Sequence, residues 1–347
     1  MSSTYFHRVQ QQTPTRFWIN NVTREQIALA LDSGAVGCTQ NPAYTWKLME
    51  HDDEKPRIIS LVSEIIKNQT SDNEALIELQ KMLITDVAKS FLPVYESSGH
   101  KQGYVSIQGD PFQEDTESII RYARCNVSGS PNLMAKVPVT KEGLEAIRVL
   151  LSEGIAINAT EVMAISQVAD ICNIYNEACS SMENPPVCYF SHITGIYDEY
   201  LQNVVAEQGI DISPDTLWHA GMVIAKKAYS VAKAISPSIG FIGGGARDLH
   251  HFTEMVGANA VVTINWNGTA DKLIEQNPVV CQRFFMPTPD AVIDELCEKL
   301  PDFVKGYFSY GICTEEYEDF GPVVLFRSMF EEAWNNALNF IKTQRQQ

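Results

Sequence analysis

The chain has 347 residues, of which 45% are hydrophobic and 20% charged, as expected of a soluble globular protein with one large α/β domain or two smaller ones. Its formal net charge of −17 and the lack of a basic run argue against binding to nucleic acid or to an anionic membrane surface. Residues 1–15 are polar and resemble neither a secretory signal nor a membrane anchor, and no apolar run approaches the ~20 residues that cross a bilayer.

Eight cysteines are scattered along the chain without a C-x-x-C pair, and most lie in apolar runs such as Val187-Cys188-Tyr189. This usage is typical of buried thiols in a reducing cytosol, and it favours neither a disulfide framework nor a zinc site. We therefore expect a cytoplasmic protein with no metal and no other cofactor.

Short apolar strands alternate with helical stretches along most of the chain. Helices are expected from Thr23 to Gly34, around 56–68 and 73–95, from about 161 to 179 and, after a polar excursion, over 220–235. The predicted strands are 16–20, 35–39, 103–108, 132–138, 154–158, 186–191, 238–242 and 259–264.

Eight strand–helix units predict a (β/α)8 barrel over about 15–276, within a single domain. A doubly wound open sheet is the alternative, but it would need fewer strands or a second domain. The residues from 277 to 347 are expected to be helical and to lie beyond the barrel, with Pro287-Thr288-Pro289 starting one helix and Gly321-Pro322 starting an amphipathic last one. Such a tail would cover the barrel rim or form a contact in a homo-oligomer.

Lys136 is the centre of the most informative segment, which reads N-L-M-A-K-V-P-V-T from residue 132 to residue 140. The apolar residues predict a strand buried on both faces, which ends near Pro138 because proline cannot donate to a ladder. Thr140 then caps a helix. In an α/β barrel, a side chain at this end of a strand points into the active-site mouth, where desolvation lowers a lysine pKa and leaves a neutral nucleophile. A lysine that snorkels to the surface is the alternative.

Polar and mostly uncharged residues stand at the other predicted strand ends. Together their amides and hydroxyls suit a polyhydroxylated small molecule, although each one taken singly is also an ordinary cap or turn residue. The set consists of Asn20, Asn41, Gln108, Lys136, Asn158, Thr160, Ser191, His192, the loop from Gly243 to Arg247, and Asn265.

The glycines at 243–245 follow the seventh predicted strand and precede Arg247. In a barrel this loop often binds phosphate through backbone N–H groups and a helix N-terminus, and an arginine adds a two-pronged contact. The glycine spacing is not that of a dinucleotide fingerprint. We predict an anion site at Gly244, Gly245 and Arg247, with a surface turn and a solvated arginine as the alternative.

These segments resemble the transaldolase family of Schiff-base enzymes on a (β/α)8 barrel. The resemblance runs over about 15–264 and is strongest in A-K-V-P-V-T-K-E-G-L-E-A-I at 135–147 and E-G-I-A-I-N-A-T at 153–160. Further support comes from F-W-I-N-N-V-T-R at 17–24, G-C-T-Q-N-P-A at 37–43, Y-V-S-I-Q-G-D-P at 104–111, A-K-K-A-Y at 225–229 and G-G-A-R at 244–247.

The resemblance implies that Lys136 forms an imine with a ketose or ketose phosphate, without a cofactor, in carbohydrate metabolism such as the pentose phosphate pathway. The implied catalytic set is Lys136, Asn20, Gln108, Thr160 and His192. The implied substrate-binding set is Asn41, Asn158, Ser191, Gly244, Gly245 and Arg247.

Two acid–base positions depart from the family pattern. Asn20 stands where the family usually has an aspartate that moves the proton in carbon–carbon cleavage. Gln108 stands where it usually has a glutamate that positions the catalytic water, as also in the fructose-6-phosphate aldolase branch. Because an asparagine cannot take a proton, we expect the base at His192, with Tyr197, Asp110 or a water relay as alternatives.

The phosphate positions depart as well. Ile196 replaces an arginine that binds the substrate phosphate in the family, and Gly245 replaces the serine before the second such arginine, which is kept as Arg247. A phosphorylated substrate and one with a neutral tail are therefore both open.

We predict a Schiff-base enzyme that cleaves or transfers a dihydroxyacetone unit, with Gln108 favouring the lyase. One alternative is a relative that binds a sugar or sugar phosphate without turnover, because two carboxylates and a cation are missing. Another is a barrel enzyme, for instance an isomerase, in which Lys136 is only an electrostatic clamp.

Overall fold

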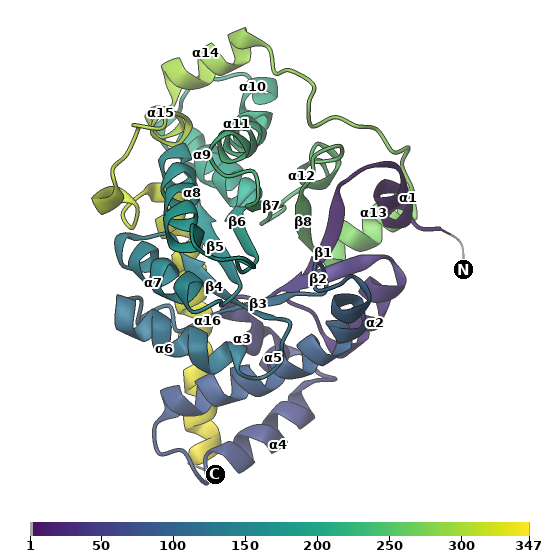
Figure 1. Cartoon of the computed structure of the whole chain (residues 1–347), viewed down its shortest axis with the longest axis vertical. Coiled ribbons are helices and arrows are strands. Elements are labelled where there is room, and N and C mark those ends of the chain that lie inside the picture. The colour runs from purple at the N-terminus through teal and green to yellow at the C-terminus, as the bar shows by residue number, and fades with distance from the viewer. Residues whose placement is uncertain (1–2, 347) are drawn as a thin grey trace.

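The computed structural model describes residues 3–346 and confirms the predicted barrel. Eight parallel strands close in the order β1 to β8, with β1 paired to both β2 and β8 (Figure 1). The strands are β1 Arg16–Asn20, β2 Ala35–Thr39, β3 Val105–Gln108, β4 Leu133–Pro138, β5 Ile157–Val162, β6 Cys188–His192, β7 Gly240–Gly243 and β8 Val261–Asn265.

Helices surround the barrel on its outer face. They are α1 Tyr5–Gln12, α2 Arg24–Asp32, α3 Ala43–Glu50, α4 Lys55–Ile65, α5 Asp72–Ser97, α6 Thr116–Val127, α7 Lys141–Ser152, α8 Ile165–Cys179, α9 Thr194–Gln208, α10 Pro214–Trp218, α11 Ala220–Ile235, α12 His250–Thr253 and α13 Asp271–Gln276. Beyond the barrel follow α14 Asp290–Lys299, α15 Pro301–Tyr307 and α16 Gly321–Arg345; short turns η1 Trp266–Ala270 and η2 Thr314–Glu316 complete the set. No helix within residues 3–346 is both long and apolar enough to span a bilayer.

The caps read from the sequence form as expected. The hydroxyl of Thr23 accepts the backbone N–H of Gln26, and that of Thr140 accepts the backbone N–H of Gly143. Each bond satisfies one of the free N–H groups at a helix start, so α2 and α7 begin at the residue that follows the threonine. Strand β4 is buried along its whole length, because side chains fill the barrel on one face and helices cover the other.

Three parts of the chain differ from the prediction. Strand β5 continues to Val162, whereas a helix was expected from about Glu161; that helix, α8, begins at Ile165. The predicted polar excursion contains α9, and the N-terminal segment that we described as polar contains α1. Helix α1 forms because Phe6 stacks on Phe17 of β1, with ring centroids 4.0 Å apart, so three apolar side chains of the helix are buried.

The eight cysteines are all free, as predicted. Their burial is only partly as expected: four are buried, whereas Cys281 and Cys313 are exposed.

Helix α16 packs against α3, α4, α5 and α9, and it runs behind the other elements in the view of Figure 1. Its Trp334 is fully buried, and the indole Nε1–H donates to Oδ1 of Asn73 at 2.9 Å. Arg345 donates to Asp72 at 2.7 Å near the end of the helix. These contacts hold α16 to the N-terminal half of the barrel.

Trp334→Ala should lower the free energy of unfolding by about 3–5 kcal/mol, because it leaves a large cavity and an unpartnered amide. Denaturant unfolding monitored by circular dichroism measures this change. Trp334→Phe, which keeps most of the apolar volume, should lose only about 1–2 kcal/mol. Equal losses in the two variants would contradict an anchoring role for the indole.

Candidate active site

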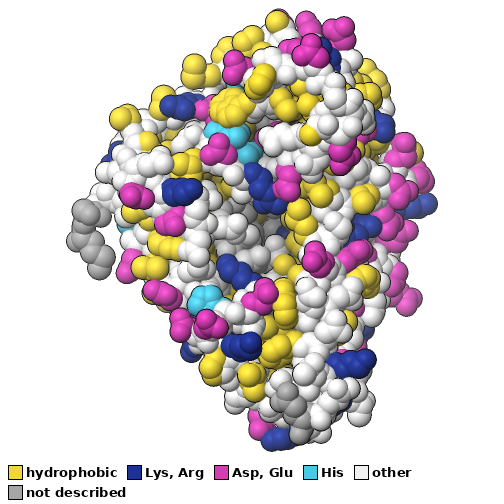
Figure 2. All heavy atoms as spheres, turned by 180° about the vertical axis from the view of Figure 1, so that it is seen from behind, with side chains coloured by type: hydrophobic (Ala, Val, Ile, Leu, Met, Phe, Trp, Pro, Cys, Tyr) yellow, Lys and Arg dark blue, Asp and Glu magenta, His cyan; other side chains and the backbone are white. Residues whose placement is uncertain are grey.

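A cavity of about 200 Å³ lies at the carboxyl ends of the barrel strands. In the view from behind, Figure 2 shows a hollow near the centre of the molecule, bordered by Lys or Arg side chains. The cavity brings together seven of the predicted site residues: Asn20, Asn41, Lys136, Ser191, Gly244, Gly245 and Arg247. Asn265, also expected at the rim, lines it together with Asn21, Thr39, Ala43, Ile193, Ala246, Thr263, Ile264, Phe326, Met329 and Phe330.

Lys136 projects its amine into this cavity from the end of β4. The residue is only 7% exposed, and no hydrogen bond or ion pair joins Nζ to any residue from 3 to 346. The ring centroids of Phe330 and Phe326, both from α16, lie 5.5 and 5.8 Å from Nζ. Burial lowers the pKa of Lys136 to about 8, against the opposing charges of Glu161 and Glu114. A useful fraction of the amine is therefore neutral near physiological pH.

The strand register places polar side chains beside this lysine. Gln108 of β3 and Asn158 of β5 pair with Lys136 on either side. Asn158 does not line the cavity; it accepts a hydrogen bond from the hydroxyl of Ser191 at 2.6 Å and donates to Ser106 at 3.1 Å. Asn158 thus positions Ser191, which does line the cavity.

Asn20 belongs to a second polar network across the mouth. Its Nδ2 donates to Oδ1 of Asn265 at 3.0 Å, and its Oδ1 accepts the hydroxyl of Thr39 at 3.0 Å. The hydroxyls of Thr39 and Thr263 lie 2.7 Å apart. This network presents amide and hydroxyl groups to the cavity, as binding of a polyhydroxylated molecule requires.

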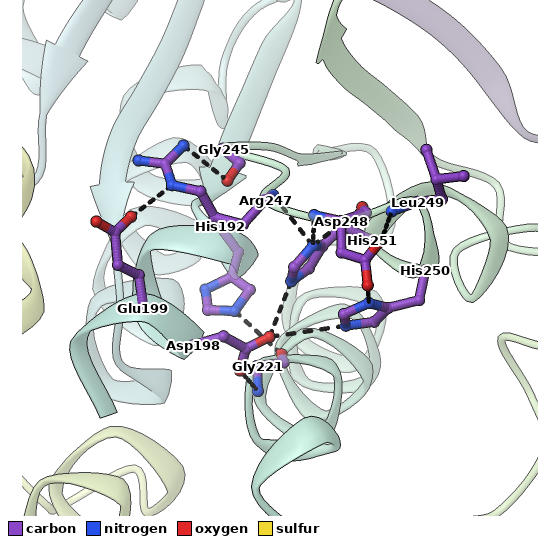
Figure 3. Close-up of polar contacts among 10 residues, drawn as sticks. All are labelled: His192, Asp198, Glu199, Gly221, Gly245, Arg247, Asp248, Leu249, His250 and His251. Carbon is purple, nitrogen blue, oxygen red and sulfur yellow. Dashed lines mark hydrogen bonds and ion pairs between the residues drawn. The ribbon is translucent and has the colours of Figure 1, made fainter. Parts of the chain in front are cut away.

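Arg247 lies on the loop after β7, as predicted, and is exposed at the cavity edge (Figure 3). Its guanidinium is paired with Glu199 of α9, and Nη1 reaches the carbonyl oxygen of Gly245 at 3.4 Å. An anion at this loop would compete with Glu199 for the guanidinium. Ile196, at the position where the resemblance implied a second phosphate-binding arginine, is fully buried beneath the loop.

The loop is held from below by Asp198 and His251 (Figure 3). The backbone N–H groups of Arg247 and Asp248 donate to Nδ1 of His251, at 3.2 and 3.1 Å. Nε2 of His251 therefore carries the proton and donates to Oδ2 of Asp198 at 2.8 Å. His250 lies close by, and one possible ligand atom from each of Asp198, His250 and His251 lies within 4.8 Å of the others. Such an arrangement could hold a metal ion. Here, however, hydrogen bonds already engage Asp198 and His251.

Gly195 at the start of α9 touches the same loop. A Cβ at this position would overlap the carbonyl oxygen of Gly245. Gly195→Ala should therefore displace the loop, weakening the binding of an anionic ligand about tenfold or more and lowering stability by about 1–3 kcal/mol. Binding of inorganic phosphate by calorimetry and denaturant unfolding measure the two effects. Gly209→Ala at the far end of α9 should also lower stability, because Gly209 has a left-handed φ of +63°, but it should leave phosphate binding unchanged.

Comparisons with known proteins agree with this geometry. The sequence profile of the family described as Transaldolase/Fructose-6-phosphate aldolase matches residues 17–301. The chain belongs to this family. It is 31% identical to a transaldolase of Saccharopolyspora erythraea over 171 residues (46% of this chain and 44% of that protein), and 29% identical to one of Trichodesmium erythraeum over 217 residues (55% of each). A transaldolase of Thermobifida fusca is 24% identical over 240 residues, 64% of this chain and 63% of that protein. The chain thus spans only about half the length of the relatives that it matches.

Gln108, at the end of β3, lies between two carboxyl groups. Nε2 of Gln108 donates to Oε1 of Glu161 at 2.8 Å and to Oε1 of Glu114 at 3.3 Å. Arg327 of α16 approaches Glu114, with 3.3 Å between Nε and Oε2. The sequence analysis assigned none of these three residues to the site.

Glu161 reaches Gln108 because β5 is irregular near its end. The pairing of β5 with β6 shifts between Ala159 and Val162, and Glu161 has a left-handed backbone with φ of +63°. A bulge of this kind re-aims a side chain, and a left-handed glutamate is a strained conformation. Glu161 consequently lies fully buried beside the other carboxyl.

The remaining residues that the sequence analysis proposed for acid–base roles do not line the 200 Å³ cavity. Both ring nitrogens of His192 face backbone carbonyls: Nδ1 lies 2.9 Å from the carbonyl oxygen of Val162. Nε2 lies 3.3 Å from that of Gly221 (Figure 3). The hydroxyl of Tyr197 donates to the carbonyl of Asp302, and Asp110 accepts from Asn73. Thr160 is buried on β5, and its hydroxyl has no partner among the described residues.

Proposed function

We propose that the protein is a cytoplasmic Schiff-base enzyme that cleaves or transfers a dihydroxyacetone unit from a ketose or ketose phosphate. The observation that carries this proposal is the amine of Lys136, which is buried, unpaired among residues 3–346 and open to a cavity at the barrel mouth. The neutral amine attacks the ketose carbonyl, water leaves and an imine forms. The bond between the third and fourth carbons then breaks, and its electron pair is held as an enamine on the enzyme.

The same residues would bind the rest of the sugar. Asn20, Asn41 and Ser191 offer hydrogen bonds to hydroxyl groups, and the loop with Gly244, Gly245 and Arg247 suits an anionic end. An acceptor aldehyde would complete a transferase reaction, whereas protonation of the enamine and hydrolysis would complete a lyase reaction.

Borohydride trapping tests the proposal directly. Incubation with fructose 6-phosphate, dihydroxyacetone and related ketoses, followed by reduction and peptide mass spectrometry, should place a stable adduct on Lys136. Absence of an adduct across a broad ketose panel would reject the proposal. Because trapping reports a covalent bond, it also separates this chemistry from a lysine that acts only as an electrostatic clamp.

A sugar-binding protein without turnover is the second candidate. It is favoured by one observation: the lining of the large cavity contains no carboxylate within residues 3–346. Such a protein would bind ketoses with saturable affinity and form no triose product. Product formation that is lost in Lys136→Ala would exclude it.

The pair between Arg247 and Glu199 predicts how substrate charge is recognised. Glu199→Gln should lower the KM for a ketose phosphate about three- to tenfold, because the phosphate no longer competes with a carboxylate for the guanidinium. The KM for the unphosphorylated ketose should stay the same. Steady-state kinetics with both substrates give the comparison, and an equal change for the two would show that Arg247 does not contact the anion.

A further inference from the structure

The two buried carboxyl groups around Gln108 lie in a region that the proposed imine chemistry does not yet use. Glu161 is fully buried and the side chain of Glu114 is 12% exposed. Both accept from the same amide nitrogen, so they are held close together. Carboxyl groups this close repel each other when both are ionised, and a shared proton relieves that repulsion.

Unpartnered polar atoms gather at the same place. Oε2 of Glu161 and Oε1 of Gln108 are buried without a hydrogen bond from the described residues, and Oε2 of Glu114 has only the ion pair with Nε of Arg327 at 3.3 Å. Buried polar atoms are seldom left in this state unless a water, a proton or a ligand completes them. These three atoms around Gln108 indicate that protons or water occupy the cluster.

A second, small cavity is lined by both Glu114 and the lysine, and Glu161 reaches it through Gln108. Its volume is about 20 Å³, and its lining includes Gln108, Glu114 and Lys136. This is room for about one water molecule, which needs two to four polar partners and finds them here. A water at this point would bridge the carboxyl of Glu114 and the amine of Lys136.

The charges in the cluster fix how many protons it holds. Two cations, Lys136 and Arg327, face the two carboxyl groups, with the half-exposed Glu318 on the far side of Arg327. When Lys136 is an ammonium, both carboxyl groups can be ionised and the charges balance. When the amine is neutral, Arg327 alone cannot balance two carboxylates in a buried site, so one carboxyl keeps a proton.

We propose that Glu114 and Glu161 form a carboxyl pair that stores the proton of Lys136 and returns it during imine formation. This assignment rests on the proposed function and names the acid–base group of that site. The pair replaces acidic side chains at 20 and 108, and it draws its residues from the loop after β3 and from the bulged end of β5.

The proton and electron balance of this step closes without another reactant. The ammonium of Lys136 passes a proton through the bridging water to a carboxylate of the pair. The amine then attacks the ketose carbonyl, the C–N bond forms, and the carbonyl oxygen takes a proton from the nitrogen to give a carbinolamine. The carboxyl returns its stored proton to the carbinolamine hydroxyl, which leaves as water while the nitrogen lone pair forms the iminium.

The pKa shifts have the signs that this role requires. Burial, together with the charge of Glu161, raises the pKa of Glu114 well above its ordinary value. Burial also raises the pKa of Glu161, although Arg327, Gln108 and Lys136 act in the opposite direction. Burial lowers that of Lys136 to about 8, so the acid and the amine approach each other in proton affinity.

The test compares Glu114→Gln, Glu161→Gln and the double variant with the full-length protein. Glutamine keeps the shape and the hydrogen-bonding capacity but cannot store a proton. The rate of borohydride-trapped imine formation at pH 7 should fall about 10²-fold or more in the double variant. Glu318→Gln is the matched control, because it removes another carboxylate that contacts Arg327 and should leave the rate unchanged.

Infrared difference spectroscopy supplies a readout independent of turnover. At neutral pH the wild-type protein should show a weak carbonyl stretch of a buried, protonated carboxyl, from the fraction of molecules whose Lys136 amine is neutral, and this band should be absent in the double variant but present in Glu318→Gln. If the double variant folds and traps ketose at the wild-type rate and pH dependence, or if the band is missing from the wild type, the assignment is overturned. If the wild-type protein itself traps no ketose, the proposed function fails instead, and a band present in the wild type would still establish the proton-storing pair.

Discussion

Replacing Lys136 by methionine should abolish borohydride trapping and lower any ketose cleavage or transfer at least about 10³-fold. Methionine has a similar length and fits the apolar surroundings made by Phe326 and Phe330, so the variant should fold and still bind the sugar. The physical reason for the loss is that no other described lysine lines the cavity. Adduct mass spectrometry and a coupled triose assay measure the two effects.

Lys233→Met is the matched control for this prediction. Lys233 is also partly buried, burial also lowers its pKa, and its amine donates to the carbonyls of Pro237 and Ile239, away from the strand ends that form the site. Borohydride trapping should be unaffected in Lys233→Met. An adduct that persists in Lys136→Met, or one that disappears in Lys233→Met, would place the nucleophile elsewhere.

The second large effect concerns the aromatic side chains that exclude water from the amine. Phe330→Ala should admit water beside Nζ and raise the pKa of Lys136 from about 8 toward the 10.5 of a solvated lysine, because burial is the main cause of the shift. The neutral fraction at pH 7 falls about tenfold for each unit of that rise. Imine formation at pH 7 should therefore slow by about ten- to a hundredfold, while the rate near pH 10 should fall by no more than about twofold.

The measurement is the rate of imine trapping from pH 6 to pH 10 at saturating ketose. The wild-type rate should rise through about pH 8, and the Phe330→Ala profile should be displaced to higher pH without a lower plateau. Phe340→Ala removes the same side chain from the same helix, away from the cavity lining, and should lower stability without displacing the profile. A Phe330→Ala profile with an unchanged midpoint and a lower plateau would mean that the ring positions the substrate rather than controlling the charge of the amine.

The barrel was predictable because its strands are short apolar runs and its helices carry clear start signals. Thr23 and Thr140 cap their helices as expected, and α11 spans Ala220–Ile235 as predicted. These features depend on neighbours in sequence, where side-chain pattern and backbone preference act together. The end of the lysine strand was predictable for the same reason, since Pro138 closes an apolar run.

The acid–base residues were not predictable in the same way. Glutamate is common in the first turn of a helix, so Glu161 suggested a helix start, whereas the structure uses it on a bulged strand with a left-handed backbone. The segment that carries Arg327 and Phe330 was expected to be an amphipathic last helix that covers the barrel rim or forms an oligomer contact, but nothing local in the sequence decides between the two. The one signal in the sequence is the position of Glu161, which directly follows Thr160, a residue expected at a strand end.

Helix α16 follows every barrel strand in the chain, and this order has a consequence for the protein during its synthesis. A ribosome releases Lys136 long before it releases Phe326 and Phe330. Until those rings arrive, the amine lacks the apolar cover that lowers its pKa. The low proton affinity of Lys136 is therefore acquired only when the C-terminal helix docks.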